Sequence, residues 1–318
     1  MSGNIEVETE KSMRNELYLK ISVCILFVLS FSSFASAGTW KTIDFPNMYP
    51  GMPDRFQDGA VGISSNFAVT TCVANYTDHA CLYNGSTFTL LDAPGASYTR
   101  GYGIDGSNLV GTYIGASGSR GFIYNISSQA WTTVGNMPGY GGTEVYGIDG
   151  SKVIGMTINL DGTYAKPFIF DGSTWQLLDM PNSNYLQLYG ISGNKAVGTY
   201  SDLHTAHGCL YDNGQWKTID VPGAYDTYAL GIEGNKIVGT CSLSQKQLSF
   251  LYDGSSYITF SKPGAYFTKA TSIDGDNIAG LYMDNAGIHG FIYTIPEPAT
   301  FFVLAAGVMT LRNRKYKS

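Results

Sequence analysis

The chain has 318 residues, enough for one or two domains, and a formal net charge of −6. Residues 38–295 contain twelve Lys and Arg against twenty Asp and Glu, a balance that repels phosphate and argues against nucleic acid as a partner. With 39 Gly, 23 Tyr, only 14% charged residues and no long apolar helical pattern, the composition is typical of all-β structure.

Residues 1–37 have the order of a secretory signal peptide. Basic residues precede an apolar run at 21–31, and Ala35 and Ala37 occupy the small positions before an expected signal peptidase cut after Ala37. The basic residues are Lys11, Arg14 and Lys20. The apolar run is short for a membrane span, and the alternative is an N-terminal anchor helix. An acidic stretch near the start is unusual for such a signal, so Met13 is an alternative start.

The rest of the chain repeats one unit six times. Each unit has a Gly-Ile motif (Ser-Ile in the last), then a stretch such as GFIY, then in most units an aromatic stretch such as WKTIDVP. The units start near residues 62, 103, 147, 190, 231 and 272, at spacings of 41 to 44 residues. All four Trp occupy one repeat position, which indicates a structural role: Trp40, Trp131, Trp175 and Trp216.

The repeat predicts an all-β fold. Each unit divides into four short stretches of strand character, broken by Gly, Asn, Asp and Pro. Four strands in just over forty residues are typical of one β-propeller blade. Asp-Gly and Asn-Gly pairs after the third stretch predict hairpin turns. We therefore expect a six-bladed β-propeller over residues 38–294.

The first stretch after the signal peptide indicates how the ring closes. Residues 40–46 (WKTIDFP) match the end of a unit but have no unit before them, and the sixth unit stops at 290–294 without a fourth stretch. We expect the strand at 40–46 to complete the last blade, because this removes a free sheet edge.

Three units carry a His motif at the start of the third stretch, at 79–81 (HAC), 207–209 (HGC) and 289–291 (HGF). These units resemble the HAF family of extracellular repeats, named for His-Ala-Phe. The resemblance implies export and carries no established chemistry. Because these three His recur with the repeat, on units far apart in a ring, we interpret them as scaffold and expect no metal site and no cofactor.

Cys72 and Cys81 lie nine residues apart on the second and third stretches of the first unit. The same spacing elsewhere holds mostly aromatic pairs and predicts two residues opposite each other across a hairpin. An oxidising exported setting favours a Cys72–Cys81 disulfide; the alternative is two small buried hydrophobic residues. Cys209 and Cys241, on neighbouring units, are expected to be free and buried.

The sequence contains no catalytic motif such as Gly-x-Ser-x-Gly, a phosphate loop or a paired His-Glu. DGSTW at 171–175 is similar to the Asp box of sialidase-type propellers but lacks its leading Ser. The arginines between the two signal segments, Arg55, Arg100 and Arg120, precede or lie in the first two units, which does not favour an arginine triad. We assign no catalytic residue and expect no enzyme; the alternative is a surface glycosidase or polysaccharide lyase.

The C-terminal segment, 295–318, has three parts: Pro296-Glu297-Pro298, an apolar segment at 299–311, and a basic cluster. The cluster consists of Arg312, Arg314, Lys315 and Lys317. A short apolar helix followed by cations halts in a bilayer with the cations on the cytoplasmic side. This tail closely resembles the PEP-CTERM sorting signal of Gram-negative bacteria, the substrate of the membrane protease exosortase. The resemblance implies a transient inner-membrane stage, cleavage near Pro296–Pro298 and delivery to the cell surface or outside; the alternative is a retained anchor.

The resemblance to this sorting system, which is associated with exopolysaccharide production, implies a binding or biofilm-matrix role. We therefore expect a non-catalytic surface protein whose partner is extracellular polysaccharide, since exposed Tyr on ring loops suits sugar stacking. The Tyr-rich links at 140–146, 182–189 and 223–230 are expected between blades. Some tyrosines of these links would line one face of the ring. The alternative, which we favour for most of these tyrosines, is that they cover the junctions between blades.

Overall fold

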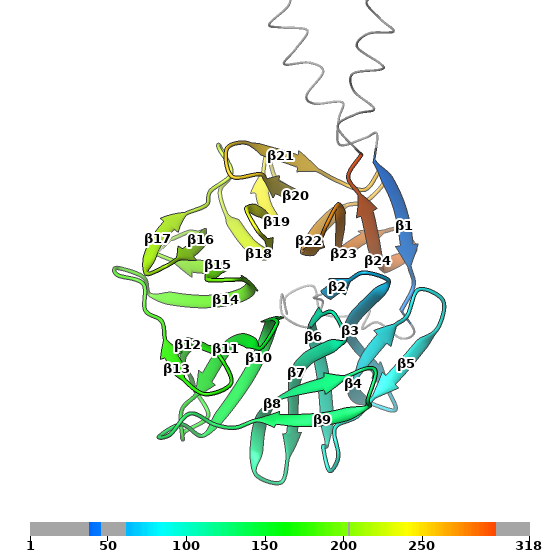
Figure 1. Cartoon of the computed structure of the whole chain (residues 1–318). Coiled ribbons are helices and arrows are strands. Elements are labelled where there is room, and N and C mark those ends of the chain that lie inside the picture. Colours follow the sequence, from blue (N-terminus) through cyan, green and yellow to red (C-terminus); the bar gives the residue numbers. More distant parts are fainter. Residues whose placement is uncertain (1–37, 46–61, 203, 297–318) are drawn as a thin grey trace, which may run out of the picture. The chain divides into compact units, whose positions relative to one another are not determined.

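The computed structural model describes residues 38–45, 62–202 and 204–296 (Figure 1). The strands all belong to one compact unit, Thr39–Ser318. The predicted signal peptide and the sorting tail from Glu297 onward lie outside the described residues, as does Arg55.

The described residues form 24 strands, almost all in antiparallel pairs. Four sheets have four strands each, in chain order. The first contains β2 (Gly62–Ser64), β3 (Phe67–Ala74), β4 (Thr77–Tyr83) and β5 (Phe88–Leu91). The second contains β6 (Tyr98–Asp105), β7 (Asn108–Gly115), β8 (Gly118–Asn125) and β9 (Ala130–Val134). The third contains β10 (Gly142–Asp149), β11 (Lys152–Ile158), β12 (Tyr164–Phe170) and β13 (Trp175–Leu177). The fourth contains β14 (Tyr185–Ser192), β15 (Lys195–Ser201), β16 (Ala206–Asp212) and β17 (Gln215–Thr218).

The other eight strands form two further four-stranded groups, joined by one parallel pair between Gln247 and Phe267. One group contains β18 (Thr227–Glu233), β19 (Lys236–Leu243), β20 (Lys246–Tyr252) and β21 (Tyr257–Phe260). The other contains β22 (Phe267–Asp274), β23 (Asn277–Asp284), β24 (Gly287–Thr294) and β1 (Thr39–Ile43). The predicted all-β fold of four-stranded antiparallel units is confirmed.

The strand β1 pairs with β24, so the N-terminal stretch completes the last unit as the sequence predicts. Thr39 lies opposite Thr294, and Trp40 lies opposite Tyr293. Beyond the strand, Phe45 is buried against Tyr83 and Phe88 of the first unit, at ring-centroid distances of 6.4 and 5.3 Å. The N-terminal segment therefore contacts both the last and the first unit.

The first strands of the units, β2, β6, β10, β14, β18 and β22, each contact the next in this order, and β22 contacts β2 (Figure 1). Five of these strands, all except β2, carry a β-bulge just before the Ile of the repeat motif. A glycine of the second strand makes room for it: a Cβ at Gly155 would lie 1.8 Å from the carbonyl oxygen of Glu144. The second strands of five units carry a glycine at this position, which reflects a tight backbone contact inside each of them: Gly111, Gly155, Gly198, Gly239 and Gly280.

Aromatic pairs join the third and fourth strands. Each Trp lies against an aromatic residue of the neighbouring third strand, with ring centroids 4.4 to 5.0 Å apart. The pairs are Trp40–Tyr293, Trp131–Tyr124, Trp175–Phe170 and Trp216–Tyr211. In the other two units Phe88 and Tyr257 pack on Tyr83 and Tyr252. This packing attaches the short outer strand to its sheet.

Candidate functional site

At the carboxyl ends of the first strands, six side chains link each unit to the next. Each side chain accepts a hydrogen bond from a backbone N–H in the turn that follows the next unit's first strand. We call these six residues the latch ring: Ser64, Asp105, Asp149, Ser192, Glu233 and Asp274. Their donors are the N–H groups of Gly106, Gly150, Gly193, Gly234, Gly275 and Ser65. The last bond, 2.6 Å from Ser65 N to Asp274 Oδ2, joins the sixth unit to the first.

The first strands surround a cavity of about 330 Å³ whose lining includes the latch ring. The carboxylates of the ring are committed to backbone N–H groups. Within the described ranges, no group of three or more His, Cys, Asp or Glu is placed to hold a metal ion. The hydrogen bonds at this end of the cavity link neighbouring units.

The three repeat histidines each bond the Asp that ends the fourth stretch. The Nδ1 atoms of His79, His207 and His289 lie 2.6, 2.8 and 2.6 Å from carboxylate oxygens of Asp92, Asp220 and Asp44, respectively. In the third unit Lys166 bonds Asp179 at the same place. Burial alone would lower the pKa of His207, but Asp220 and Asp202 outweigh it and raise this pKa above its ordinary value.

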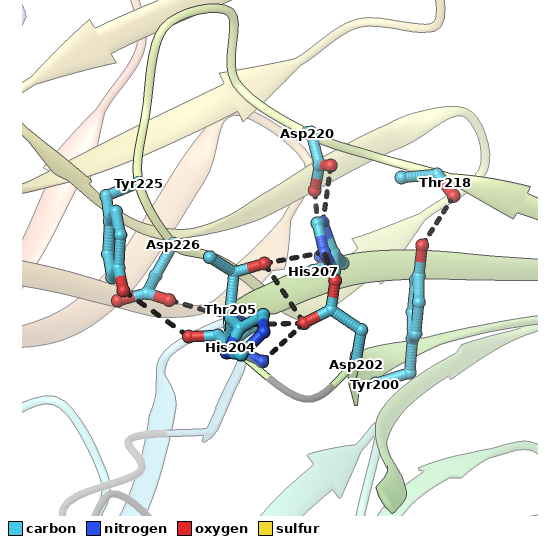
Figure 2. A network of polar contacts seen from close by, with 11 residues as sticks. Tyr200, Asp202, His204, Thr205, His207, Thr218, Asp220, Tyr225 and Asp226 are labelled. Carbon is cyan, nitrogen blue, oxygen red and sulfur yellow. Dashed lines mark hydrogen bonds and ion pairs between the residues drawn. The ribbon is translucent and has the colours of Figure 1, made fainter. Parts of the chain in front are cut away.

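Around His207 the contacts extend into a network that superficially has the order of a catalytic triad (Figure 2). Thr205 Oγ1 lies 2.9 Å from Nε2 of His207, and Nδ1 of the same ring bonds Asp220. The neighbouring N–H groups of His204 and Thr205 donate to Asp202 and lower its pKa to about 2.

Two observations argue against catalysis at Thr205. The loop's N–H groups are engaged, since that of Ala206 also donates to a carboxylate, Asp226, so they do not form an oxyanion hole. The His–Asp pair also recurs in units without this Thr contact, at His79 and His289. The interpretation of these histidines as scaffold agrees with this geometry.

The amino ends of the first strands carry a different set of side chains. In the second to sixth units the residue three positions before the Gly-Ile or Ser-Ile motif is polar, and a bulge follows it. These residues are Arg100, Glu144, Gln187, Tyr228 and Lys269. Bulges frequently re-aim side chains next to functional sites.

Two of these residues, Glu144 and Gln187, lie together with three tyrosines. We call these five residues the tyrosine cluster: Glu144, Tyr146, Tyr164, Tyr185 and Gln187. Tyr146 and Tyr164 both donate to Oε2 of Glu144, at 2.6 and 3.1 Å, and Tyr185 donates to Oε1 of Gln187. Gln187 and Tyr146 are buried, whereas Tyr164 is 50% exposed and Tyr185 45% exposed. A half-buried carboxylate thus lies among phenol groups, two of which present their rings to solvent.

Burial, followed by the charge of Glu144, raises the pKa of Tyr146, Tyr164 and Tyr185. Since a raised pKa disfavours the phenolate, these hydroxyls remain protonated donors near neutral pH. The cluster therefore lacks an activated tyrosine nucleophile.

The structure does not bring the described arginines together. Arg100 bonds Asp78 at 2.7 Å, while Arg120 donates to the carbonyl oxygens of Ser119 and Gly141. The Asp of the DGSTW stretch, Asp171, accepts hydrogen bonds from its own turn, from Ser173 and Thr174. The hairpin-turn prediction for this pair of residues is confirmed by Gly172, whose φ is +97°.

The placement predicted for the cysteines of the first unit is wrong in detail. Cys72 lies opposite His79, and Cys81 opposite Thr70, so the two cysteines are diagonal neighbours. Both are buried free thiols in the structure, and the hydrogen bond between them is the main cause that raises the pKa of Cys72. The disulfide stays a prediction, which a thiol titration of the unfolded, unreduced protein would test. Cys209 and Cys241 are buried in separate core clusters.

Sequence analysis missed the tyrosine cluster as a site. No role was predicted for Glu144, and structural roles were favoured for most tyrosines of the links at 140–146, 182–189 and 223–230. That interpretation fits buried Tyr146 but not Tyr185 and Tyr225, which are exposed. The available signal was a polar residue at one fixed position of five units, between small or apolar neighbours.

No protein-family model matches the chain, and no curated protein matches it. Among solved structures it is similar to the uncomplexed acylaminoacyl peptidase of Pyrococcus horikoshii, with a TM-score of 0.50 and 9% identity over 83% of this chain and 47% of that one. The β-propeller domain of the Trilobed protease from Pyrococcus furiosus matches with a TM-score of 0.46 and 9% identity, over 76% of this chain and 96% of that one. Trypanosoma rangeli sialidase matches with a TM-score of 0.46 and 10% identity, over 88% of this chain and 63% of the sialidase chain.

The arrangement of four-stranded sheets is propeller-like, and at such identities the likeness shows the fold alone. The chain spans about half the length of the peptidase that it matches. Within the described ranges, no helix has the length and apolarity needed to span a bilayer. The predicted segment at 299–311 lies outside these ranges.

Proposed function

We propose that the protein is an exported surface protein whose closed six-bladed propeller binds extracellular polysaccharide without cleaving it. Export rests on the signal peptide pattern, with Ala35 and Ala37 at its cleavage site. Surface delivery rests on the resemblance of residues 295–318 to a PEP-CTERM signal processed by exosortase. HAF-type repeats are consistent with this destination.

Three contacts support a closed ring. β1 pairs with β24, β22 contacts β2, and the Asp274 carboxylate accepts a hydrogen bond from Ser65. A closed ring has no free sheet edge at the junction between the last and the first unit.

The tyrosine cluster carries the proposal of binding. Half-exposed aromatic rings beside a small number of fixed polar groups are typical of sites for small polar ligands, sugars included. Tyr164 and Tyr185 provide the rings, and Glu144 provides the polar group between them. The protonated phenols argue only against a tyrosine nucleophile or base, so a hydrolysis screen has to separate binding from the alternative, a glycosidase or lyase.

The binding test uses a glycan array with the protein and its double variant Tyr164→Ala/Tyr185→Ala. We expect the double variant to bind at least about tenfold more weakly, because each stacked ring contributes on the order of 1 kcal/mol. Tyr76→Ala is the matched control, since Tyr76 is fully exposed on a hairpin turn outside the cluster.

A hydrolysis screen on the same polysaccharides separates the two functions. Binding without product release supports the proposal. Release of products by the protein, lost in the double variant, would instead establish the glycosidase or lyase. Equal binding by the protein and its double variant would remove the cluster as the binding site.

A further inference from the structure

The hydrogen bonds of the tyrosine cluster fix the direction of its phenolic O–H bonds. Tyr146 and Tyr164 point theirs at one oxygen, Oε2 of Glu144, and Tyr185 points its O–H at Gln187. The raised pKa values of these phenols keep the protons in place near neutral pH. The three phenolic donors of the cluster are thus used internally.

Glu144 and the phenolic oxygens consequently offer a ligand acceptors. Among the described residues, no donor is hydrogen-bonded to the second oxygen of Glu144, Oε1. The phenolic oxygens of Tyr164 and Tyr185 also retain lone pairs, and an O–H group that donates to a carboxylate becomes a stronger acceptor. The half-exposed rings add apolar faces for the C–H faces of a sugar.

We infer that this site takes uncharged, hydroxyl-rich sugars in preference to uronic acids. Sugar hydroxyls supply the donors that Glu144 and the phenolic oxygens need. A uronic acid would instead bring its carboxylate next to that of Glu144, which costs free energy through like-charge repulsion. This specificity rests on the proposed binding function and narrows it to one class of ligand.

Arg100, which lies near the cluster, and Lys269, which occupies the same repeat position on β22, define the competing outcome. Arg100 lies close enough to Tyr164 to affect its ionisation, but its Nε atom bonds Asp78 and its guanidinium lies 5.0 Å from the ring centre of Tyr98. Lys269 is only 6% exposed. If Arg100 governed recognition, the site would select acidic polysaccharides.

The experiment measures dissociation constants by calorimetry, with neutral galactomannan and β-glucan as one class and polygalacturonate and alginate as the other. The variant is Glu144→Gln, and Glu233→Gln is the matched control. Glu233 is the other glutamate between the two signal segments and lies in the latch ring, at the opposite ends of the first strands. Tyr164→Phe, which keeps the ring and removes one hydroxyl, provides a milder variant, and thermal unfolding checks that each variant is folded.

We expect the unchanged protein to bind at least one neutral polymer about tenfold more tightly than either polyuronate. Glu144→Gln should weaken neutral binding about tenfold, the usual effect of losing a charged acceptor, and reduce the discrimination against uronates. Glu233→Gln should leave both affinities within about twofold. Tyr164→Phe should weaken neutral binding by about threefold.

Tighter binding of polyuronates, or equal behaviour of the two Gln variants, would overturn the inference. If polyuronates bind tightly to the unchanged protein but not to the Tyr164→Ala/Tyr185→Ala variant, the proposed binding function is supported and only the inferred sugar specificity is wrong. If neither class of polymer binds, the proposed function falls together with the inference.

Discussion

The glycine of each Gly-Ile motif is required by the spacing of first strands in neighbouring units. A Cβ at Gly147 would lie 2.6 Å from the carbonyl oxygen of Tyr189, and Gly103 is as tightly placed against Tyr146. The sixth unit has Ser272 instead, and its Oγ accepts a hydrogen bond from the N–H of Ile63 at 3.3 Å. At the junction of the last and first units, the hydrogen bond of the Ser272 side chain thus replaces the close backbone contact that a glycine makes at the other junctions.

We expect Gly147→Ala to lower the free energy of unfolding by about 1–3 kcal/mol, the usual cost of overpacking. The atom that Cβ would meet is backbone, which cannot move aside as a flexible side chain can. Urea denaturation measures the effect. Gly135→Ala is the control, because nothing lies within 4 Å of a Cβ at that position. Equal stabilities of the two variants would contradict this account.

Between elements, the His–Asp pairs fasten the end of the fourth stretch to the third strand. His289 of β24 bonds Asp44, which follows β1, and stacks on Tyr282 of β23 at a centroid distance of 5.0 Å. The hydrogen bond from Asp44 is the main cause that raises the pKa of His289, against the opposing effect of burial. The charged imidazole is therefore favoured in the folded state.

This raised pKa predicts a pH-dependent coupling between His289 and Asp44. The stabilisation is complete below the pKa of an unfolded histidine, about 6.5, and is lost as the pH rises through the higher folded-state pKa. A double-mutant cycle with His289→Gln and Asp44→Asn should thus give a larger coupling energy at about pH 5.5 than at about pH 8.5.

The pair Lys166–Asp179 is the control for this cycle, since lysines in general do not titrate in that range. Its coupling energy should stay the same at both pH values. A His289–Asp44 coupling that grows with pH would contradict the assignment of the charged pair.

For the whole molecule, the decisive junction is the one between the last unit and the first. β1 supplies the outer strand of the last unit, and Phe45 is buried with Cys72, Cys81 and Ile63 of the first unit and Ala279 of the last. The contacts that join the two ends of the repeat array therefore include a hydrophobic core as well as hydrogen bonds.

Deletion of residues 38–46 should destabilise all units in one transition, by at least the ~3 kcal/mol typical of removing one buried aromatic side chain. The deletion exposes an edge on β24 and removes Phe45 from the core. Thermal unfolding, followed by circular dichroism, measures the change, and Lys41→Ala is the control within the same strand. An unchanged melting temperature would count against closure of the ring.

The sequence by itself determined the four-stranded units, their boundaries within a few residues, the hairpin turns and the partner of the strand at 40–46. These features depend on local periodicity and on a motif repeated six times. Both can be recognised in the amino-acid sequence without any three-dimensional information. The proposed export rests on the sequence alone, because the predicted signal segments lie outside the described residues.

Only the tertiary structure decided the candidate site and the contacts between units. The tyrosine cluster combines Glu144 of β10, Tyr164 of β12 and Tyr185 of β14, which no sequence spacing brings together. The diagonal placement of Cys72 and Cys81 likewise depends on strand register. Repeat patterns encode what every unit shares, whereas a site arises from side chains in which the units differ, and these meet only when neighbouring sheets pack.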